Sequence, residues 1–239
     1  MFPGANTRGW LVLLAGLTLV AEPVSAQRRA APGPRDGGHG FFAVGVQRAD
    51  IDRLNNALFA SGLPAFSQTF LTLGGGGFAV RNRFLIGGEG HGLIQSSETT
   101  ADGVFRTGVT AGFGLFDLGY QVWRSGRFAV YPMVGIGGGG ISLRIRERAT
   151  VDFDDLLDDP RRGVTVTGAG MLLSASLGAD LLIPVGPARR GGFLVGVQGG
   201  YTFFPLEAAW FADGSDVAGG PDVRLTGPWL RVTVGGGRR

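Results

Sequence analysis

Residues 164–184 read VTVTGAGMLLSASLGADLLIP, and from Met171 onward this stretch alternates between two kinds of residue, apart from Leu172 and Leu182. The odd-numbered positions carry apolar residues: Met171, Leu173, Ala175, Leu177, Ala179, Leu181 and Ile183. The even-numbered positions include small or polar residues: Gly168, Gly170, Ser174, Ser176, Gly178 and Asp180. A period of two predicts a β-strand with one apolar face. The opposite face is rich in glycine, unlike the charged surface of a soluble sheet.

The same patterning recurs along the rest of the chain after residue 39. The segments with this pattern are Gly40–Arg48, Thr69–Val80, Arg83–Gln95, Val104–Trp123, Arg127–Arg146, Val164–Pro184, Gly191–Phe204 and Gly227–Gly236. We expect each of these eight segments to form a strand, because β-branched and aromatic residues alternate with small ones in them.

A closed barrel in lipid explains this patterning better than a soluble sandwich. Apolar residues would face hydrocarbon, and glycine and polar residues would share a narrow interior. The ring must close, since an open strand edge in hydrocarbon leaves backbone groups without hydrogen bonds. The sequence therefore predicts an all-β protein, an eight-stranded antiparallel transmembrane β-barrel. No later stretch is long and apolar enough to be a transmembrane helix.

The connections between the expected strands alternate in length. The short ones are 81–82, 124–126 and 185–190, and the long ones are 49–68, 96–103, 147–163 and 205–226. The short turns and their flanks carry arginine and no acid, whereas one long loop carries the acidic cluster Asp152–Asp159. Short periplasmic turns and longer extracellular loops are typical of bacterial outer-membrane barrels.

From Gly40 to its C-terminus the chain resembles the small eight-stranded outer-membrane β-barrel proteins of Gram-negative bacteria. The resemblance lies in this architecture and in glycine-aromatic strands such as Gly112–Phe116 and Leu118–Tyr120. It implies a location in the cell outer membrane, insertion by the barrel-assembly machinery and contact with outer-membrane lipid and lipopolysaccharide. It also implies a monomer and no nucleic-acid partner.

The N-terminus reads as a processing segment. Arg8 precedes an apolar run, Trp10–Ala21, which is followed by Val24-Ser25-Ala26. This arrangement predicts a signal peptide, residues 1–26, cleaved between Ala26 and Gln27. Residues 27–39 are rich in arginine, proline and glycine and are expected to form a flexible periplasmic leader. The barrel is expected to occupy residues 40–239.

Projecting the alternation into the expected barrel gives a set of polar lumen residues. These are Glu89, His91, Arg106, Arg144, Asp180, Gln198 and Arg231, and Asp117 joins them if a bulge near Phe116 shifts the phase. The interior of an eight-stranded barrel is only wide enough for side chains to fill it, so buried charges there must pair. We expect a structural polar plug. A small-solute pore or narrow passage is the alternative if the plug opens.

His91 also suggests a barrel enzyme that modifies outer-membrane lipid, with Ser96 or Ser97 as the nucleophile. The sequence marks neither a third catalytic residue nor an oxyanion donor. We therefore expect no enzyme, and a structural, surface-interaction or narrow-passage role instead. The lipid-modifying enzyme with His91 at its centre stays as an alternative.

Composition excludes several kinds of site. The chain has no cysteine and no lysine and only two histidines, so thiolate zinc sites and P-loop or Schiff-base chemistry are absent and no cofactor is expected. Residues 135–140 match the dinucleotide pattern G-x-G-x-x-G, but an alternating strand follows where that site needs a helix. The cluster Asp152–Asp159 lacks EF-hand spacing and reads as a solvated loop, with loosely held divalent cations as the alternative.

The first long loop contains one helical pattern. Residues Ile51–Ser61 have apolar side chains at 51, 54, 58 and 59, which predicts a short amphipathic helix. Such a helix either caps the mouth of the barrel or lies on the membrane interface, and the pattern does not choose between these positions.

Overall fold

Period-two patterning does produce long strands in the computed structural model. Among the described residues, the eight long strands are β1 (Gly37–Arg48), β2 (Thr69–Arg81), β3 (Phe84–Ile94), β5 (Phe105–Tyr120), β7 (Phe128–Glu147), β8 (Gly163–Val185), β9 (Gly191–Phe203) and β12 (Gly227–Arg238). Four shorter strands accompany them: β4 (Glu98–Thr99), β6 (Trp123–Ser125), β10 (Ala209–Ala212) and β11 (Ser215–Asp216). One helix, α1 (Asp52–Ala60), follows β1.

The structure describes residues 37–100, 103–147, 163–185, 191–205, 209–212, 215–217, 220–221 and 223–238. The expected signal peptide, most of the leader and the acidic cluster Asp152–Asp159 lie outside these residues, and the expectations for them stay predictions.

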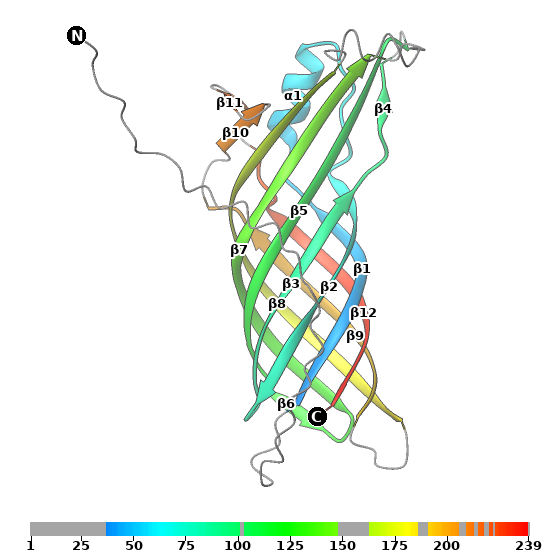
Figure 1. Ribbon diagram of the computed structural model, residues 1–239, viewed down its shortest axis with the longest axis vertical. Helices are drawn as coiled ribbons and strands as arrows, with labels where there is room; N and C mark the ends of the chain where they lie inside the picture. The colour runs from blue at the N-terminus through cyan, green and yellow to red at the C-terminus, as the bar shows by residue number, and fades with distance from the viewer. Residues whose placement is uncertain are drawn as a thin grey trace, which may run out of the picture. The chain divides into compact units, whose positions relative to one another are not determined.

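The eight long strands close into a ring (Figure 1). Each pairs with its neighbour along the chain, β12 pairs back to β1, and all of these pairings are antiparallel. The ring therefore has no free edge at its waist. The fold expected from the sequence, a closed eight-stranded antiparallel barrel, is confirmed.

Some boundaries differ from those expected. β1 begins at Gly37, so His39 belongs to the barrel rather than to the leader. The segment expected as one strand over 104–123 stops at Tyr120, and Trp123–Ser125 forms the separate strand β6, which pairs with the start of β7. β4, β10 and β11 lie in connections that were expected to be loops.

The two ends of the barrel differ in their connections, and we call them the turn end and the loop end. At the turn end, Asn82 and Arg83 join β2 to β3 with φ of 48° and 74°. Two successive positive φ values are those of a type I′ turn, whose twist suits a hairpin. Gly126, with φ of 56°, makes the turn between β6 and β7. The loop end carries α1, β4, β10 and β11 (Figure 1).

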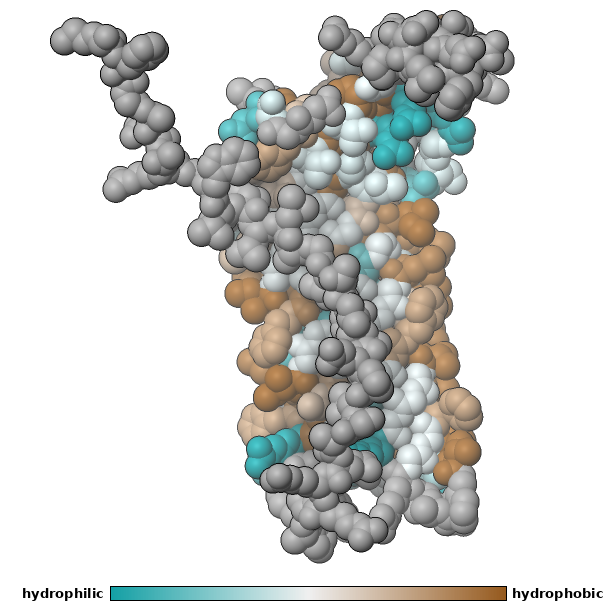
Figure 2. All heavy atoms as spheres, viewed as in Figure 1, coloured by the Kyte–Doolittle hydropathy of each residue, from teal (hydrophilic) through white to brown (hydrophobic). Residues whose placement is uncertain are grey.

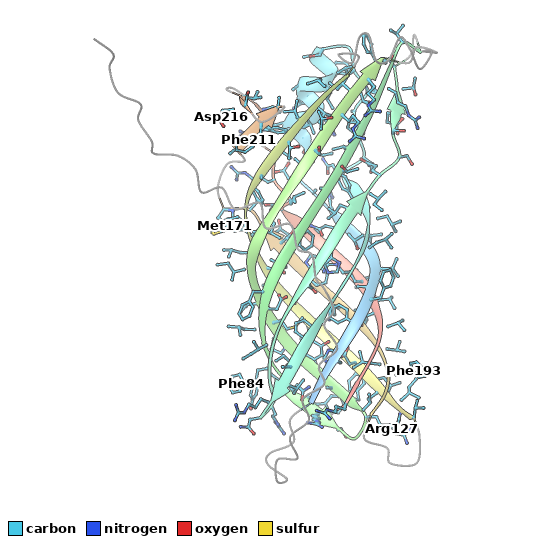
Figure 3. All side chains as sticks on the ribbon, viewed as in Figure 1. Phe84, Arg127, Met171, Phe193, Phe211 and Asp216 are labelled. Carbon is cyan, nitrogen blue, oxygen red and sulfur yellow. The ribbon has the colours of Figure 1, made fainter. Side chains whose placement is uncertain are left out.

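The outer surface of the barrel is an apolar belt (Figure 2). Its exposed side chains include Phe42, Val44, Val46, Leu71, Ile86, Phe116, Leu118, Val134, Ile136, Leu177, Leu181, Val195, Leu230, Val232 and Val234. Aromatic residues gather at its turn end, where the rings of Phe84 and Tyr120 lie 5.0 Å apart. Figure 3 shows Phe84, Met171 and Phe193 pointing away from the barrel. This surface is the opposite of that expected for a barrel in water.

Helix α1 covers the mouth of the barrel at the loop end. Its residues Leu54 and Leu58 are buried in an apolar cluster with Phe113 and Leu143 of the barrel wall. Of the two positions that its pattern left open, the helix therefore takes the cap. None of the helices that the described residues form has the length and hydropathy needed to cross a membrane.

Candidate functional site

The interior of the barrel has three layers. Towards the loop end lies an apolar cluster, the loop-end plug: Ala49, Ile51, Leu54, Leu58, Phe66, Phe70, Leu93, Val109, Phe113, Leu115, Ile141, Leu143, Leu172, Phe204, Trp210, Val223 and Leu225. Towards the turn end lies a second one, the turn-end cluster: Phe41, Ala43, Phe78, Val80, Leu85, Ala129, Tyr131 and Met133. Buried polar and charged side chains from several strands lie between these clusters or beside them.

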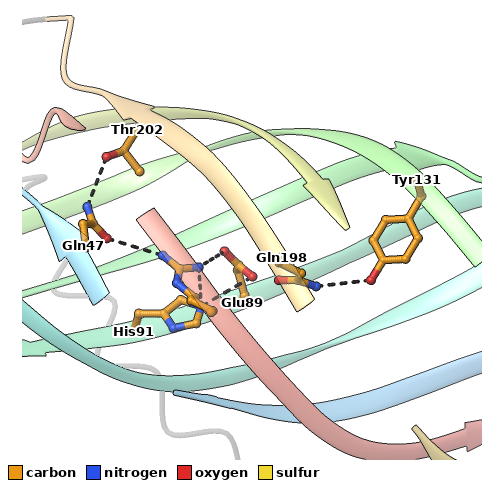
Figure 4. Close-up of polar contacts among 7 residues, drawn as sticks. Gln47, Glu89, His91, Tyr131, Gln198 and Thr202 are labelled. Atoms are coloured by element: carbon orange, nitrogen blue, oxygen red, sulfur yellow. Dashed lines mark hydrogen bonds and ion pairs between the residues drawn. The ribbon is translucent and has the colours of Figure 1, made fainter. Parts of the chain in front are cut away.

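Arg231 of β12 contacts three other side chains of the polar layer, Gln47, Glu89 and His91, which are labelled in Figure 4. Its Nη1 donates a hydrogen bond of 3.0 Å to Glu89 Oε1 and lies 3.0 Å from His91 Nε2. Its Nη2 donates to Gln47 Oε1 at 3.4 Å. The guanidinium carbon also lies 3.9 Å from the centroid of the Trp229 ring. Arg231 is 1% exposed, so its charge is neutralised by protein groups inside the lumen.

Three further hydrogen bonds connect this layer to its surroundings. Gln47 Nε2 donates to Thr202 Oγ1 at 3.1 Å, and that hydroxyl donates to the carbonyl oxygen of Leu225 at 2.6 Å. The polar layer is thereby bonded to the backbone of the loop-end plug. On the other side, Gln198 Nε2 donates to the hydroxyl of Tyr131, a member of the turn-end cluster, at 3.3 Å.

Two more carboxyl groups are buried in the lumen. Asp180 is 1% exposed, and its Oδ2 lies 3.9 Å from His39 Nε2. Asp117 is 3% exposed. Among the described residues, His39 and His91 are the buried imidazoles of this layer, and Arg231 is its buried guanidinium. The layer therefore combines buried carboxyl, imidazole and guanidinium groups.

Glycine makes room for these side chains on the facing strands. A Cβ at Gly45 would lie 2.8 Å from Arg231 Cγ, and one at Gly76 would lie 2.9 Å from Glu89 Cβ. A Cβ at Gly74 would overlap the ring of His91. These glycines therefore leave room for side chains of the lumen, as does Gly135 of β7, where a Cβ would overlap Asp117 Oδ1.

The structure places six of the eight candidate lumen residues inside the barrel: Glu89, His91, Asp117, Asp180, Gln198 and Arg231. The inward position of Asp117 was predicted only if a bulge near Phe116 shifts the phase. It faces inward without one, because the pairing of β3 with β5 runs without interruption from Phe84↔Tyr120 to Ile94↔Thr110. Along the whole of β5 the odd-numbered residues, which include Phe113, Leu115 and Asp117, face the lumen.

Arg106 and Arg144 were predicted to lie in the lumen, and the structure shows that this prediction is wrong. Both are exposed on the outer face of the barrel. In β5 the inward residues are odd-numbered, so Arg106 points out, and in β7 the even-numbered Arg144 does the same. Neither residue can neutralise a carboxylate of the lumen, and Arg231 is the guanidinium that does so there.

Sequence reasoning missed several members of the polar layer. Gln47, Thr202 and Trp229 bond to Arg231 or to each other, and Tyr131 bonds to Gln198. Extending the period of two along β1 and β12 would have found Gln47 and Trp229, because 39, 41, 43, 45 and 47 share one face, as do 229, 231 and 233.

The geometry does not assemble the catalytic pair that the sequence left open. His91 is 4% exposed, and its Nε2 contacts Arg231 and lies 3.4 Å from Glu89 Oε2. Ser97 Oγ instead accepts a hydrogen bond of 2.8 Å from Arg106 Nε, on an exposed surface. Within the part of the chain that is described, no group of three histidine or acidic side chains is arranged to hold a metal ion.

Fold and interior together define a closed eight-stranded β-barrel with an apolar outside and a filled lumen. No family model matches the chain, and no curated protein matches it.

Solved structures similar to this chain include three from bacteria. Ail, the attachment invasion locus protein of Yersinia pestis, has 9% identity and a TM-score of 0.45, covering 86% of this chain and 99% of that chain. A major outer membrane protein from Thermus thermophilus has 13% identity and a TM-score of 0.46, covering 84% and 98%. CarO of Acinetobacter baumannii has 14% identity and a TM-score of 0.33, covering 82% and 95%. These structural neighbours are outer-membrane β-barrel proteins.

Proposed function

We propose that this chain is an outer-membrane β-barrel with a sealed lumen, whose role is structural or lies in surface interactions at its loop end. It is exported by its N-terminal segment, inserted by the barrel-assembly machinery and acts as a monomer without enzymatic activity. Its loop end faces the exterior and its turn end the periplasm.

The outer surface supports a membrane location. The belt of exposed valine, leucine, isoleucine and phenylalanine surrounds a ring without free edges. Lipid accepts such a surface, whereas water does not. The aromatic group at the turn end, which includes Phe84, Tyr120 and Trp123, suits the boundary between hydrocarbon and headgroups.

The filled lumen is the observation that carries the assignment of a sealed barrel. An ion crossing it would have to displace the loop-end plug, the bonded group around Arg231 and the turn-end cluster in succession. Buried apolar and polar side chains occupy the lumen at each of these levels. A steady pore therefore has less support than a scaffold.

The lipid-modifying enzyme also has less support. His91 would have to leave the Arg231 and Glu89 contacts and reach the lipid through the barrel wall. A general base must come within hydrogen-bond distance of the proton that it removes. Its position instead fits a role in neutralising buried charge.

Cysteine labelling of intact cells tests the membrane location and the orientation. The parent chain has no cysteine, so each introduced thiol reports on its own position. We expect Asn56→Cys, exposed on α1, to react with an impermeant reagent on intact cells. Ser125→Cys, exposed at the end of β6, should react only after the outer membrane is opened. Labelling of Ser125→Cys alone on intact cells would invert the orientation, and recovery of both variants in the soluble fraction would overturn the membrane assignment.

A further inference from the structure

Three arginines form an exposed group on the outer face of the barrel, above the apolar belt. Arg106 lies on β5, and Arg144 and Arg146 lie on β7. The register places Arg106 directly opposite Arg146, and Gly108 opposite Arg144. Cross-strand partners have Cβ atoms about 5 Å apart and diagonal neighbours about 7–8 Å apart. The three guanidinium groups therefore gather on one small area of the sheet.

Like charges directly opposite each other destabilise a sheet unless something neutralises them. Among the described residues, none of the three arginines forms an ion pair with a carboxylate, and Arg106 bonds only to the neutral hydroxyl of Ser97. Glu98, the nearest acid of β4, is paired with Thr107, so it lies on the opposite face of the sheet from Arg106. Among the described residues, this concentrated positive charge therefore has no carboxylate partner.

Hydroxyl groups lie next to these arginines on the outer face of the barrel. Arg144 is paired with Thr165 of β8, and Ser142 Oγ lies 3.2 Å from Thr167 Oγ1 on the same outward face. Guanidinium forks bind phosphate with two parallel hydrogen bonds, and nearby hydroxyls bind phosphate or sugar oxygens. The chemistry of the patch therefore suits a phosphorylated sugar.

The position of the three arginines along the barrel, relative to the apolar belt, indicates where such a ligand would lie. On β8 the apolar belt reaches Met171, which is paired with Gly138 of β7. Arg144 is six residues further along β7, which in a tilted strand is roughly 15 Å towards the loop end. An arginine side chain reaches back several ångströms towards the hydrocarbon. Figure 2 shows hydrophilic surface at the loop end, over the start of β5.

We infer that Arg106, Arg144 and Arg146 form a binding site for the phosphate groups of an anionic glycolipid in the outer leaflet. This inference rests on the proposed membrane location and orientation. The glycolipid would bind to the outer face of the barrel at its loop end, and this site does not involve the lumen.

The test uses the full mature barrel reconstituted into phosphatidylcholine vesicles that contain increasing amounts of a bisphosphorylated glycolipid. The protein is captured after mild detergent extraction, and the glycolipid retained with it is measured. Chelator is present throughout, so that divalent cations held elsewhere do not bridge protein and phosphate. Resistance of the cold barrel to sodium dodecyl sulfate verifies that each variant is folded and inserted.

The combined variant Arg106→Gln, Arg144→Gln, Arg146→Gln is expected to bind the glycolipid roughly a hundredfold more weakly than the parent, since each arginine near an anionic surface contributes about a factor of five. A matched variant, Arg83→Gln, Arg124→Gln, Arg238→Gln, removes the same charge at the turn end and should bind like the parent. The parent should bind the dephosphorylated glycolipid as weakly as the first variant binds the intact one.

Equal binding by the first variant and the parent, with both folded in the vesicles, would overturn the site while leaving the membrane barrel intact. Displacement of the glycolipid from the parent by millimolar inorganic phosphate would show a free-phosphate site and overturn the lipid source. A failure of any variant or the parent to insert into vesicles would instead count against the membrane location itself.

Discussion

Arg231 and Glu89 lie 142 positions apart in the chain and meet inside the barrel, where Nη1 lies 3.0 Å from Oε1. Their strands are not neighbours in the ring: β12 pairs with β1 and β9, whereas β3 pairs with β2 and β5. The ion pair therefore spans part of the lumen and ties together strands that share no backbone hydrogen bonds. The two side chains are 0% and 3% exposed.

Glu89→Gln is expected to destabilise the barrel strongly, because it leaves the guanidinium of Arg231 buried without its counter-charge. Removing one partner of a buried pair costs about 3–5 kcal/mol. The measurement is the temperature at which the compact band in cold sodium dodecyl sulfate gels disappears. Val232→Ala, an outward change on the same strand as Arg231, should lower that temperature much less.

A double substitution tests whether the loss of stability comes from the unpaired charge of Arg231. Replacing both members, as Arg231→Met with Glu89→Gln, removes the unpaired charge and should recover part of the lost stability. If Glu89→Gln alone unfolds at the temperature of Val232→Ala, the pair is solvated and the closed network is not present.

Helix α1 is expected to contribute stability through its two buried leucines. Leu54 is 2% exposed and Leu58 is 4% exposed in the loop-end plug, and cutting a buried leucine back to alanine costs about 2–5 kcal/mol. Leu54→Ala and Leu58→Ala should each lower the denaturant midpoint of unfolding in vesicles. Phe59→Ala is the control, because Phe59 is 80% exposed on the same helix. Equal midpoints for all three variants would mean that the helix does not cap the barrel in the membrane.

Gly74→Ala is expected to impair folding, whereas Gly40→Ala is not. A Cβ at Gly74 would overlap the carbonyl oxygen of Gly90 and the ring of His91, and the backbone cannot move aside without breaking the β2–β3 ladder. A Cβ at Gly40 points outward, and its nearest neighbour in space is the carbonyl oxygen of Gly76 at 3.7 Å. Yield of the heat-modifiable band after refolding compares the two. A normal yield for Gly74→Ala would show that the lumen has spare room beside His91.

The eight long strands of the ring could be predicted from the sequence, because the alternation of side chains between two faces depends only on the geometry of the strand backbone. In β8 large apolar residues occupy one face alone from Leu173 to Ile183 apart from Leu182, so its phase, and with it the inward position of Asp180, could be assigned. β5 carries Phe113 and Leu115 inward and Phe116 and Leu118 outward. With apolar residues on both faces the pattern does not fix the phase, and for this reason the prediction for Arg106 was wrong.

The docking of α1 and the apolar layers of the lumen could not be predicted in the same way. An amphipathic helix presents the same apolar stripe to a membrane interface and to a barrel mouth. Only the three-dimensional contacts of Leu54 and Leu58 distinguish these positions. The assumption that large apolar residues face lipid also hid the inward Phe41 and Phe78, whose rings stack 5.5 Å apart in the turn-end cluster.

Ion conductance of the purified protein in planar bilayers tests the sealed lumen most directly. Insertion is first verified by recovering the heat-modifiable band from the same vesicles that are fused to the bilayer. We expect the unaltered protein to give no steady conductance above that of the lipid, because the loop-end plug, the Arg231 group and the turn-end cluster fill its interior. A reproducible open level from the inserted, unaltered barrel would contradict this account and would make it a pore.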